Sequence, residues 1–351
     1  MKLSDFYFEL PEELIAQKPA GIRGQDRLML LNRETGQVQH LSMDDLPDLI
    51  SPDTLMVFNN SKVRRSRCYG IKISEIEGQG GREQEFMFLN QMTPEGNLWH
   101  TMVKGAKKVK AGNKYRFTDG SIGTIIEHEN DAGSEFRTIQ FDSRLDDEWF
   151  GRNGHIPLPP YIRREDDDTD SERYQTIYAK ETGSSACPTA GLHFTEDMFR
   201  RLDEKGIERV FVTLHVGLGT FLPVRTETIE EHKMHEEVYT IPFDVAEKIN
   251  KAKREGRPIL AVGTTSVRTL ESASDENGFV RGGSSATQIF MYPGYKFKCV
   301  NQMFTNFHTP ESTLIMLISA FAGREHILNA YQKAVEQKYH FFSYGDCMLI
   351  K

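Results

Sequence analysis

Four stretches in the second half of the chain carry glycines, hydroxyl side chains and, in three cases, a histidine where an apolar run ends. They span residues 188–195, 212–221, 261–269 and 305–313, and read PTAGLHFT, VTLHVGLGTF, AVGTTSVRT and TNFHTPEST. Each pattern is typical of a strand that ends in a polar loop or in a helix start. Open α/β sheets and barrels place their sites at the carboxyl ends of strands. We therefore predict that the four stretches converge on one pocket.

Two of the histidines stand beside glycines. His215 shares one strand face with Thr213, and Gly217 and Gly219 follow it, so a ligand could approach the backbone closely. The alternative is a half-buried histidine that serves only the fold. His193 lies between Gly191 and the helix cap Thr195, where free backbone N–H groups are expected; its alternative is a loop histidine without a role.

The segment HKMHE, residues 232–236, is the densest cluster of titratable side chains. His232 and His235 are three residues apart, which would place them on one helical face. They could bind a metal ion, although a third and a fourth ligand are not evident. An acid–base pair in which Glu236 orients a histidine is an equal alternative.

The sequence GTTS, residues 263–266, joins an apolar run to a predicted helix with Arg268 in its first turn. A helix start of this kind can bind an anion or a hydroxyl group. The spaced glycines of a nucleotide-binding P-loop are missing. The alternative is an ordinary capped helix.

Basic residues gather at two places in the first half of the chain. The first group is Lys62, Arg64, Arg65 and Arg67, and the second is Lys104, Lys107, Lys108 and Lys110. Such clusters either form a solvated surface or bind phosphates of a nucleic acid. The formal net charge of −8 argues against nucleic-acid binding over the whole surface, but not against a local basic face.

The composition indicates a cytoplasmic globular protein of two domains. The chain has 351 residues, 38% of them hydrophobic and 27% charged, and no apolar run approaches the roughly 18 residues that span a membrane. The first residues show no secretory signal. The four cysteines are widely spaced, so we expect free thiols rather than disulfides or a zinc site.

The pattern of apolar residues divides the chain into an α/β core and an insert. Residues 62–150 show short alternating runs separated by turn residues, as in a small antiparallel barrel. Residues 1–61 and 151–351 alternate strand and helix patterns, which predicts a mostly parallel α/β core. Helices are expected after Thr195, over 312–322 and over 325–337.

Taken together, these motifs resemble the S-adenosylmethionine:tRNA ribosyltransferase-isomerase family of queuosine biosynthesis. The similarity also includes FELPEELIAQ (8–17), LPPYI (158–162), RYQTIYA (173–179) and FFSYGD (341–346). The resemblance implies a barrel-like α/β core with an inserted antiparallel β-barrel. It implies transfer and isomerisation of the ribosyl part of S-adenosylmethionine onto the aminomethyl-deazaguanine base at the tRNA wobble position, giving epoxyqueuosine-tRNA, adenine and methionine. S-adenosylmethionine is then a consumed substrate, and we expect no separate cofactor, no metal, no membrane and a monomer.

With this reaction in view, each candidate residue receives an expected role. We assign the proton shuttle to His235 or His193, with Glu236 as the orienting group. Ribose and oxyanion contacts are expected from Thr264, Thr265, Ser266 and Arg268. The further substrate-binding candidates are Thr189, Gly191, His215, Gly217, Gly219, Asn306 and His308. The expected tRNA contacts are Lys62, Arg64, Arg65, Lys104, Lys107 and Lys108.

The chain departs from the family pattern at a few positions. Asn60 and Lys62 replace a usual aspartate and arginine, and Asn301 replaces a usual aspartate, so a lost carboxylate could change the activity. Two other functions also stay open. One is a metal-dependent hydrolase built on His215, His232 and His235. The other is a catalytically silent module that binds tRNA.

Overall fold

The computed structural model divides into two compact units. It describes residues 1–19, 21–74, 81–126, 134–217, 224 and 226–351. The core unit comprises Met1–Lys62, Pro159–Arg164 and Glu172–Lys351, and the barrel unit comprises Val63–Leu158 and Glu165–Ser171. Gly219, one of the predicted substrate-binding residues, lies outside the described residues.

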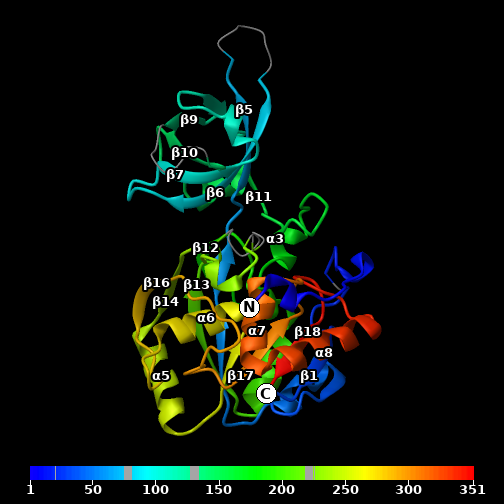
Figure 1. The fold of residues 1–351 in the computed structure, drawn as a ribbon. Coiled ribbons are helices and arrows are strands. Elements are labelled where there is room, and N and C mark those ends of the chain that lie inside the picture. The colour runs from blue at the N-terminus through cyan, green and yellow to red at the C-terminus, as the bar shows by residue number, and fades with distance from the viewer. Residues whose placement is uncertain (20, 75–80, 127–133, 218–223, 225) are drawn as a thin grey trace. The chain divides into compact units, whose positions relative to one another are not determined.

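A nine-stranded mixed sheet forms the centre of the core unit (Figure 1). In spatial order its strands are β16 (Gly283–Thr287), β14 (Glu237–Ile241), β13 (Glu208–Leu214), β3 (Leu55–Asn59), β15 (Ile259–Val262), β17 (Gln302–Asn306), β18 (Cys347–Ile350), β1 (Arg27–Leu31) and β2 (Val38–Ser42). The four strands β13, β3, β15 and β17 run parallel to one another. Their carboxyl ends therefore meet at one edge of the sheet.

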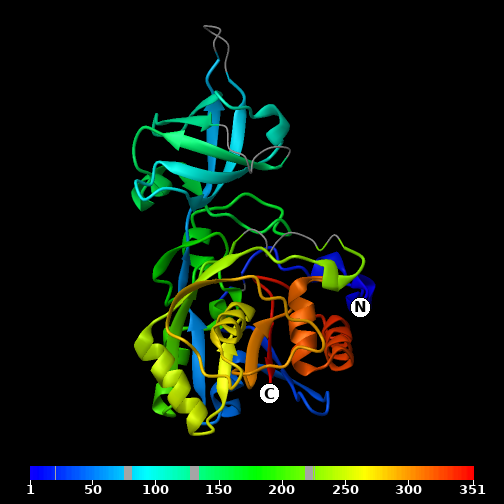
Figure 2. The same ribbon diagram turned by 60° about the vertical axis from the view of Figure 1, so that its left-hand side comes forward.

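Helices cover both faces of this sheet. The α-helices of the core unit are α1 (Leu46–Leu49), α4 (Glu196–Glu204), α5 (Phe243–Arg254), α6 (Thr264–Ala273), α7 (Thr313–Ala322) and α8 (Arg324–Glu336). The short α3 (Asp170–Arg173) has its first two residues in the barrel unit and its last two in the core unit. The helices α5, α6, α7 and α8 pack on one face of the sheet and share one hydrophobic core with it. The helices α1 and α4 pack on the other face and share a second core. The yellow α5 and the orange to red α7 and α8 lie along the same side of the sheet in both ribbon views (Figures 1 and 2).

The central strands are apolar on both faces because both faces are covered. In β3, Leu55 and Val57 belong to one core, while Met56 and Phe58 belong to the other. This burial explains why β3 and β15 read as continuous apolar runs rather than as alternating ones. A short antiparallel pair of β4 (Ser61–Val63) and β12 (Glu181–Ser184) stands apart from the large sheet.

The barrel unit is an antiparallel sheet that closes on itself. Its strands are, in order, β11 (Gly154–His155), β5 (Arg67–Lys72), β6 (Glu83–Gln91), β7 (Leu98–Val103), β10 (Phe136–Phe141), β9 (Ile122–Ile126) and β8 (Lys114–Arg116). Pairing of β5 with β8 closes the barrel. Phe88 and Trp99 pack inside it with Trp149 and Phe150 of α2 (Asp147–Asn153).

The structure confirms the predicted class, an α/β core with an inserted antiparallel barrel. The core sheet is mixed rather than mostly parallel, because β2, β14, β16 and β18 each pair antiparallel with a neighbouring strand. The cap predicted at Thr195 is confirmed, because its hydroxyl accepts from the Met198 N–H. The helix predicted over 312–322 is also present, and the Ser312 hydroxyl caps it by accepting from the Ile315 N–H. The four cysteines are free, as predicted, and all four are buried. The helical face expected for His232 and His235 is wrong, since both lie in the loop between the 3-10 turn Ile229–Glu231 and β14.

Candidate active site

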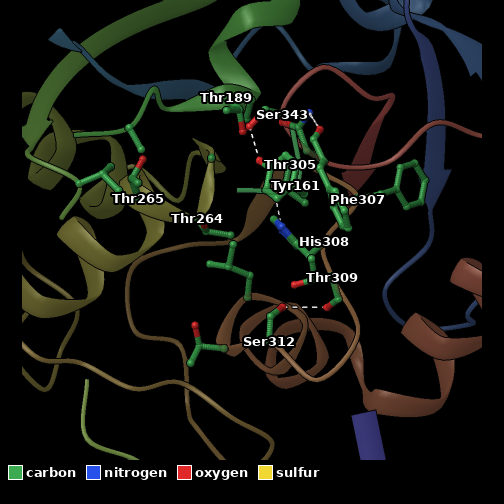
Figure 3. A pocket seen from close by; sticks show the side chains of 18 of the residues that line it. Tyr161, Thr189, Thr264, Thr265, Thr305, Phe307, His308, Thr309, Ser312 and Ser343 are labelled. Atoms are coloured by element: carbon green, nitrogen blue, oxygen red, sulfur yellow. Dashed lines mark hydrogen bonds between the residues drawn. The ribbon is translucent and has the colours of Figure 1, made fainter. Parts of the chain in front are cut away.

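A cavity of about 530 Å³ opens at the carboxyl edge of the parallel strands. Its volume is within the range of roughly 300–1,000 Å³ that is usual for sites of small ligands. All four predicted stretches contribute to its wall, through Pro188, Thr189, Ala190, Val216, Gly263, Thr264, Thr265 and residues 305–313. The sequence prediction that these stretches converge on one pocket is confirmed. Figure 3 shows side chains of Thr264, Thr309 and Ser312 around this cavity, with His308 next to Thr309.

Neighbouring strands explain this convergence. Val262, the last residue of β15, pairs with Phe304 of the parallel strand β17. The two strands therefore end side by side. The start of α6, which follows β15, and the loop 307–312, which follows β17, both line the cavity. The 3-10 turn Thr189–His193 supplies the opposite part of the wall, through Thr189 and Ala190.

Helix α6 begins at the cavity without a cap from a side chain. Gly263, its N-cap residue, has φ +88° and ψ 149°, a conformation that is nearly restricted to glycine. No side chain of the described residues caps the first N–H groups of α6. The hydroxyl of Thr265 is buried and has no hydrogen-bond partner among those residues. By contrast, Ser312 caps α7 at the same cavity. The start of α6 is therefore able to bind an anionic oxygen of a ligand.

His308 is the histidine whose side chain lines the cavity. It is 8% exposed, its Nε2 lies 2.9 Å from the Thr305 hydroxyl, and its backbone N–H donates to the Tyr331 hydroxyl at 2.9 Å. Burial lowers the pKa of His308 from 6.5 to about 3, because an imidazolium would lose its hydration there. The ring is therefore neutral at physiological pH.

His193 lies behind the cavity wall and uses both ring nitrogens. It is 2% exposed; Nδ1 lies 2.7 Å from Asp26 Oδ2, and Nε2 lies 3.1 Å from Asn306 Nδ2. Asn306 lines the cavity, whereas His193 faces a separate hollow beside Arg23 and Tyr344. Asp26 was not predicted from the sequence, because it is 167 residues away in the chain.

Several predicted substrate-binding residues support the site from outside its wall. Gly191 lets Tyr178 approach, since a Cβ at this position would lie 2.0 Å from the Tyr178 hydroxyl. The Ser266 hydroxyl donates to the Val262 carbonyl at 2.8 Å, within the helix start. His215 follows β13 and is half-buried. None of these three is among the residues that line the cavity.

Arg268 forms a buried ion pair with Glu237. The same carboxylate accepts a hydrogen bond of 3.2 Å from the backbone N–H of Gly217. Arg268 is 5% exposed and Glu237 is 4% exposed. A pair with this burial stabilises one arrangement of α6 against β14, because loss of either partner would leave a buried charge.

The candidate catalytic residues His235 and Glu236 are exposed and do not line the cavity. Burial, and secondarily the charge of His235, lowers the pKa of His232. In the part of the chain that the structure describes, no three or more metal-ligating side chains gather. His215, His232 and His235 therefore do not meet in such a group.

The basic residues differ in how free they are to contact a ligand. Lys62, Lys104, Lys107 and Lys108 are exposed. The Arg64 guanidinium instead packs over the rings of Trp99 and Phe150, at 5.3 and 5.1 Å from their centroids. It also pairs with Asp147 at 3.4 Å, and burial lowers its pKa. Arg65 is half-buried.

The departures from the family pattern lie outside the cavity wall. The Thr213 hydroxyl donates to Asn60 Oδ1 at 2.7 Å, which ties β13 to the end of β3. Asn301 accepts from the Ile259 N–H at 2.9 Å, at the amino ends of β15 and β17. The cavity lies at the carboxyl ends of β15 and β17, opposite to Asn301.

Tyr161 and Ser343 are among the lining residues that were not assigned from the sequence. The hydroxyl groups of Tyr161 and Ser343 are hydrogen-bonded to each other in the wall (Figure 3). Burial raises the pKa of Tyr161 to about 12, so the phenol is neutral. Both residues belong to motifs that carried the resemblance, LPPYI and FFSYGD, which was the available signal. No helix of the described ranges is both long and apolar enough to cross a membrane.

Comparisons with known proteins agree with one another over the whole chain. The family described as "Queuosine biosynthesis protein" matches residues 3–350. An S-adenosylmethionine:tRNA ribosyltransferase-isomerase from Treponema denticola is 52% identical over 352 residues, and one from Thermoanaerobacter sp. is 47% identical over 350 residues; each match covers 100% of both chains. The crystal structure of an S-adenosylmethionine tRNA ribosyltransferase from Thermotoga maritima is 31% identical, covers 99% of this chain and 100% of its own, and superposes with a TM-score of 0.55.

Proposed function

Because the chain belongs to the S-adenosylmethionine:tRNA ribosyltransferase-isomerase family of queuosine biosynthesis, a family of transferases, we propose a specific reaction for it. The ribosyl part of S-adenosylmethionine is transferred to the aminomethyl group of a deazaguanine base at the tRNA wobble position. The products are epoxyqueuosine-tRNA, adenine and methionine. S-adenosylmethionine is consumed as a substrate, and no separate cofactor takes part.

The observation that supports this proposal is the cavity itself. It combines apolar walls with many hydroxyl groups, one neutral imidazole and an uncapped helix start. A sulfonium nucleoside needs apolar surface for its base, hydroxyl partners for its ribose and donors for its carboxylate. The neutral state of His308 also suits a cationic substrate, because an imidazolium would repel the sulfonium.

In the proposed reaction, a base first removes a proton from the carbon beside the sulfonium. The furanose ring then opens and adenine leaves. The amine of the tRNA base adds to the sugar, the ring closes on the former ylide carbon, and an alkoxide displaces methionine to form the epoxide. The scheme needs one proton acceptor and donors for a developing oxyanion.

We assign proton acceptance to His308 instead of His193 or His235. His308 lines the cavity and is neutral, and when its Nε2–H donates to the Thr305 hydroxyl, the lone pair on Nδ1 is available. His193 already uses both ring nitrogens. We assign the stabilisation of the oxyanion, or of the substrate carboxylate, to the N–H groups at the start of α6 and to the hydroxyls of Thr264 and Thr265.

We further propose that Lys62, Lys104, Lys107 and Lys108 bind tRNA phosphates. Their exposure supports this role. Arg64 and Arg65 are less suited to it, since both are partly buried, and the stacked Arg64 would first have to leave Trp99. The proposal includes a monomer that works in the cytoplasm, where its tRNA substrate is found.

Incubation of the protein with S-adenosylmethionine and tRNA that carries the aminomethyl-deazaguanine base tests the proposal. We expect adenine and methionine in equal amounts, each equal to the amount of modified tRNA. A protein that binds this tRNA and releases no adenine would be the silent binding module instead. Activity that chelators abolish would favour the metal-dependent hydrolase.

Two variants separate the candidate bases. His308→Gln should lower kcat by roughly 10²-fold or more, as is usual for loss of a general base, with tRNA binding unchanged. His235→Ala serves as the comparison, because this side chain is exposed. If kcat falls more in His235→Ala than in His308→Gln, the proton acceptor is His235, in the loop that precedes β14, and not His308.

A further inference from the structure

The carboxamide of Asn306 has a fixed orientation. Its Nδ2 lies 3.0 Å from the Phe342 carbonyl oxygen and 3.1 Å from His193 Nε2. A carbonyl oxygen can only accept a hydrogen bond, so the atom facing Phe342 must be the amide nitrogen. The two amide hydrogens are then used by Phe342 and by His193, and the oxygen Oδ1 points elsewhere.

The same contacts define the protonation of His193. Since Nε2 accepts from Asn306, the ring hydrogen must be on Nδ1, which lies 2.7 Å from the Asp26 carboxylate. Asp26 therefore selects the tautomer whose Nε2 can hold the amide of Asn306. With the opposite tautomer, an N–H of His193 would face the NH₂ group of Asn306, and the amide would lose this support.

The oxygen of this fixed amide has no donor. Asn306 is 2% exposed, and Oδ1 has no hydrogen-bond partner within the described ranges. An unsatisfied buried acceptor is costly, so the arrangement needs a reason. Asn306 lines the cavity, which suggests that a bound ligand supplies the missing donor.

The surroundings indicate which part of the substrate this is. Ala186, Ala190 and Phe307, all less than 5% exposed, line the cavity together with Asn306. Apolar walls suit the flat neutral base of a nucleoside better than its charged amino-acid part. We propose that Asn306 Oδ1 accepts a hydrogen bond from the 6-amino group of the purine of S-adenosylmethionine, with His193 and Asp26 as positioning residues. This inference rests on the proposed function. It adds to that function the residue that recognises the adenine base of the substrate.

The test compares S-adenosylmethionine with its analogue that carries unsubstituted purine in place of adenine. Release of the base in the presence of the modified tRNA gives kcat/KM for each. The wild-type protein should prefer the 6-amino substrate by about ten- to hundredfold, as expected when a buried acceptor loses its donor. In Asn306→Ala the preference should fall to about twofold or less. A preference that survives this substitution, or that the wild-type protein lacks, would overturn the inference.

Two further variants separate positioning from structural damage. Asn306 is the last residue of β17, and Asn301 directly precedes the first residue of this strand. The variant Asn301→Ala should keep the wild-type preference for the 6-amino substrate. Asp26→Asn can donate to His193 Nδ1 and so favour the wrong tautomer, which should reduce the preference severalfold. A preference unchanged in Asp26→Asn would remove its positioning role. Because the readout is a ratio between two substrates, a general loss of folded protein does not alter it.

The wild-type result also separates this inference from the proposed function. If the wild-type protein releases no base from S-adenosylmethionine with the modified tRNA, the proposed reaction itself is wrong. If it releases adenine and purine equally well, the reaction stands and only the role of Asn306 is lost.

Discussion

Replacement of His308 by glutamine should remove about 2 kcal/mol of the pH dependence of the core unit's stability between pH 7 and pH 5. The reason is the burial of a neutral imidazole. In the unfolded chain this histidine has its ordinary pKa of 6.5, and in the folded protein the pKa is about 3. Between these values the unfolded state binds one proton more than the folded state. Stability therefore falls as the pH decreases through 6.5.

The magnitude follows from these two values. At pH 7 the unfolded histidine is mostly neutral, and at pH 5 it is almost fully charged, while the folded one stays neutral at both. The protonation of the unfolded state lowers the free energy of unfolding by about 2 kcal/mol over this interval. Glutamine does not titrate and so removes this contribution, whereas all other titrating groups are common to the two proteins.

Urea unfolding at the two pH values, followed by the circular dichroism of the helices, measures the effect. Tryptophan fluorescence would report on the wrong unit, because Trp99 and Trp149 both lie in the barrel unit. We expect the wild-type protein to lose about 2 kcal/mol more than His308→Gln between pH 7 and pH 5. Equal losses in the two proteins, within about 0.5 kcal/mol, would refute a buried neutral His308.

Three further variants test other parts of the account. Gly263→Ala forces an alanine into a conformation that favours glycine, so the free energy of unfolding should fall by about 1–3 kcal/mol in thermal unfolding. The start of α6 is then displaced, and kcat/KM should fall as well. An unchanged kcat/KM would show that the start of α6 does not bind substrate. Joint replacement of Lys104, Lys107 and Lys108 by alanine should reduce the salt dependence of tRNA binding, log K against log[salt], by about two units, and an unchanged slope in filter binding would place the phosphates elsewhere. Asn60→Asp should leave adenine release within about threefold of wild type, because the new carboxylate can still accept from the Thr213 hydroxyl, and a large gain would mean that the aspartate usual in the family contacts substrate.

The sequence predicts the parts of the fold that follow local rules. Continuous apolar runs identify β3 and β15, and hydroxyl caps identify the starts of α4 and α7. Alternation broken by turn residues identifies the barrel. The convergence of three of the four loops also follows from sequence, because the parallel strands β13, β15 and β17 bring their carboxyl ends to one edge. The turn Thr189–His193 follows none of these strands.

The remaining features depend on contacts between distant segments. Asp26 meets His193 across 167 residues, and no local pattern reveals that pair. Strand β16, Gly283–Thr287, reads GSSAT and has no apolar residue large enough to give a period. The spacing of His232 and His235 fits a helix, but β14 begins at Glu237 and extends the chain before a helix could form. Spacing without a surrounding apolar period was too little to define the element.

The central claim is that one cavity, formed by the turn Thr189–His193, the start of α6 and the loop 307–312, binds S-adenosylmethionine. A crystal structure of the protein with S-adenosylmethionine tests this claim most directly. We predict a nucleoside in this cavity, with its purine amino group on Asn306 and an anionic oxygen at the start of α6. A nucleoside bound at another surface, with the cavity empty, would contradict the account.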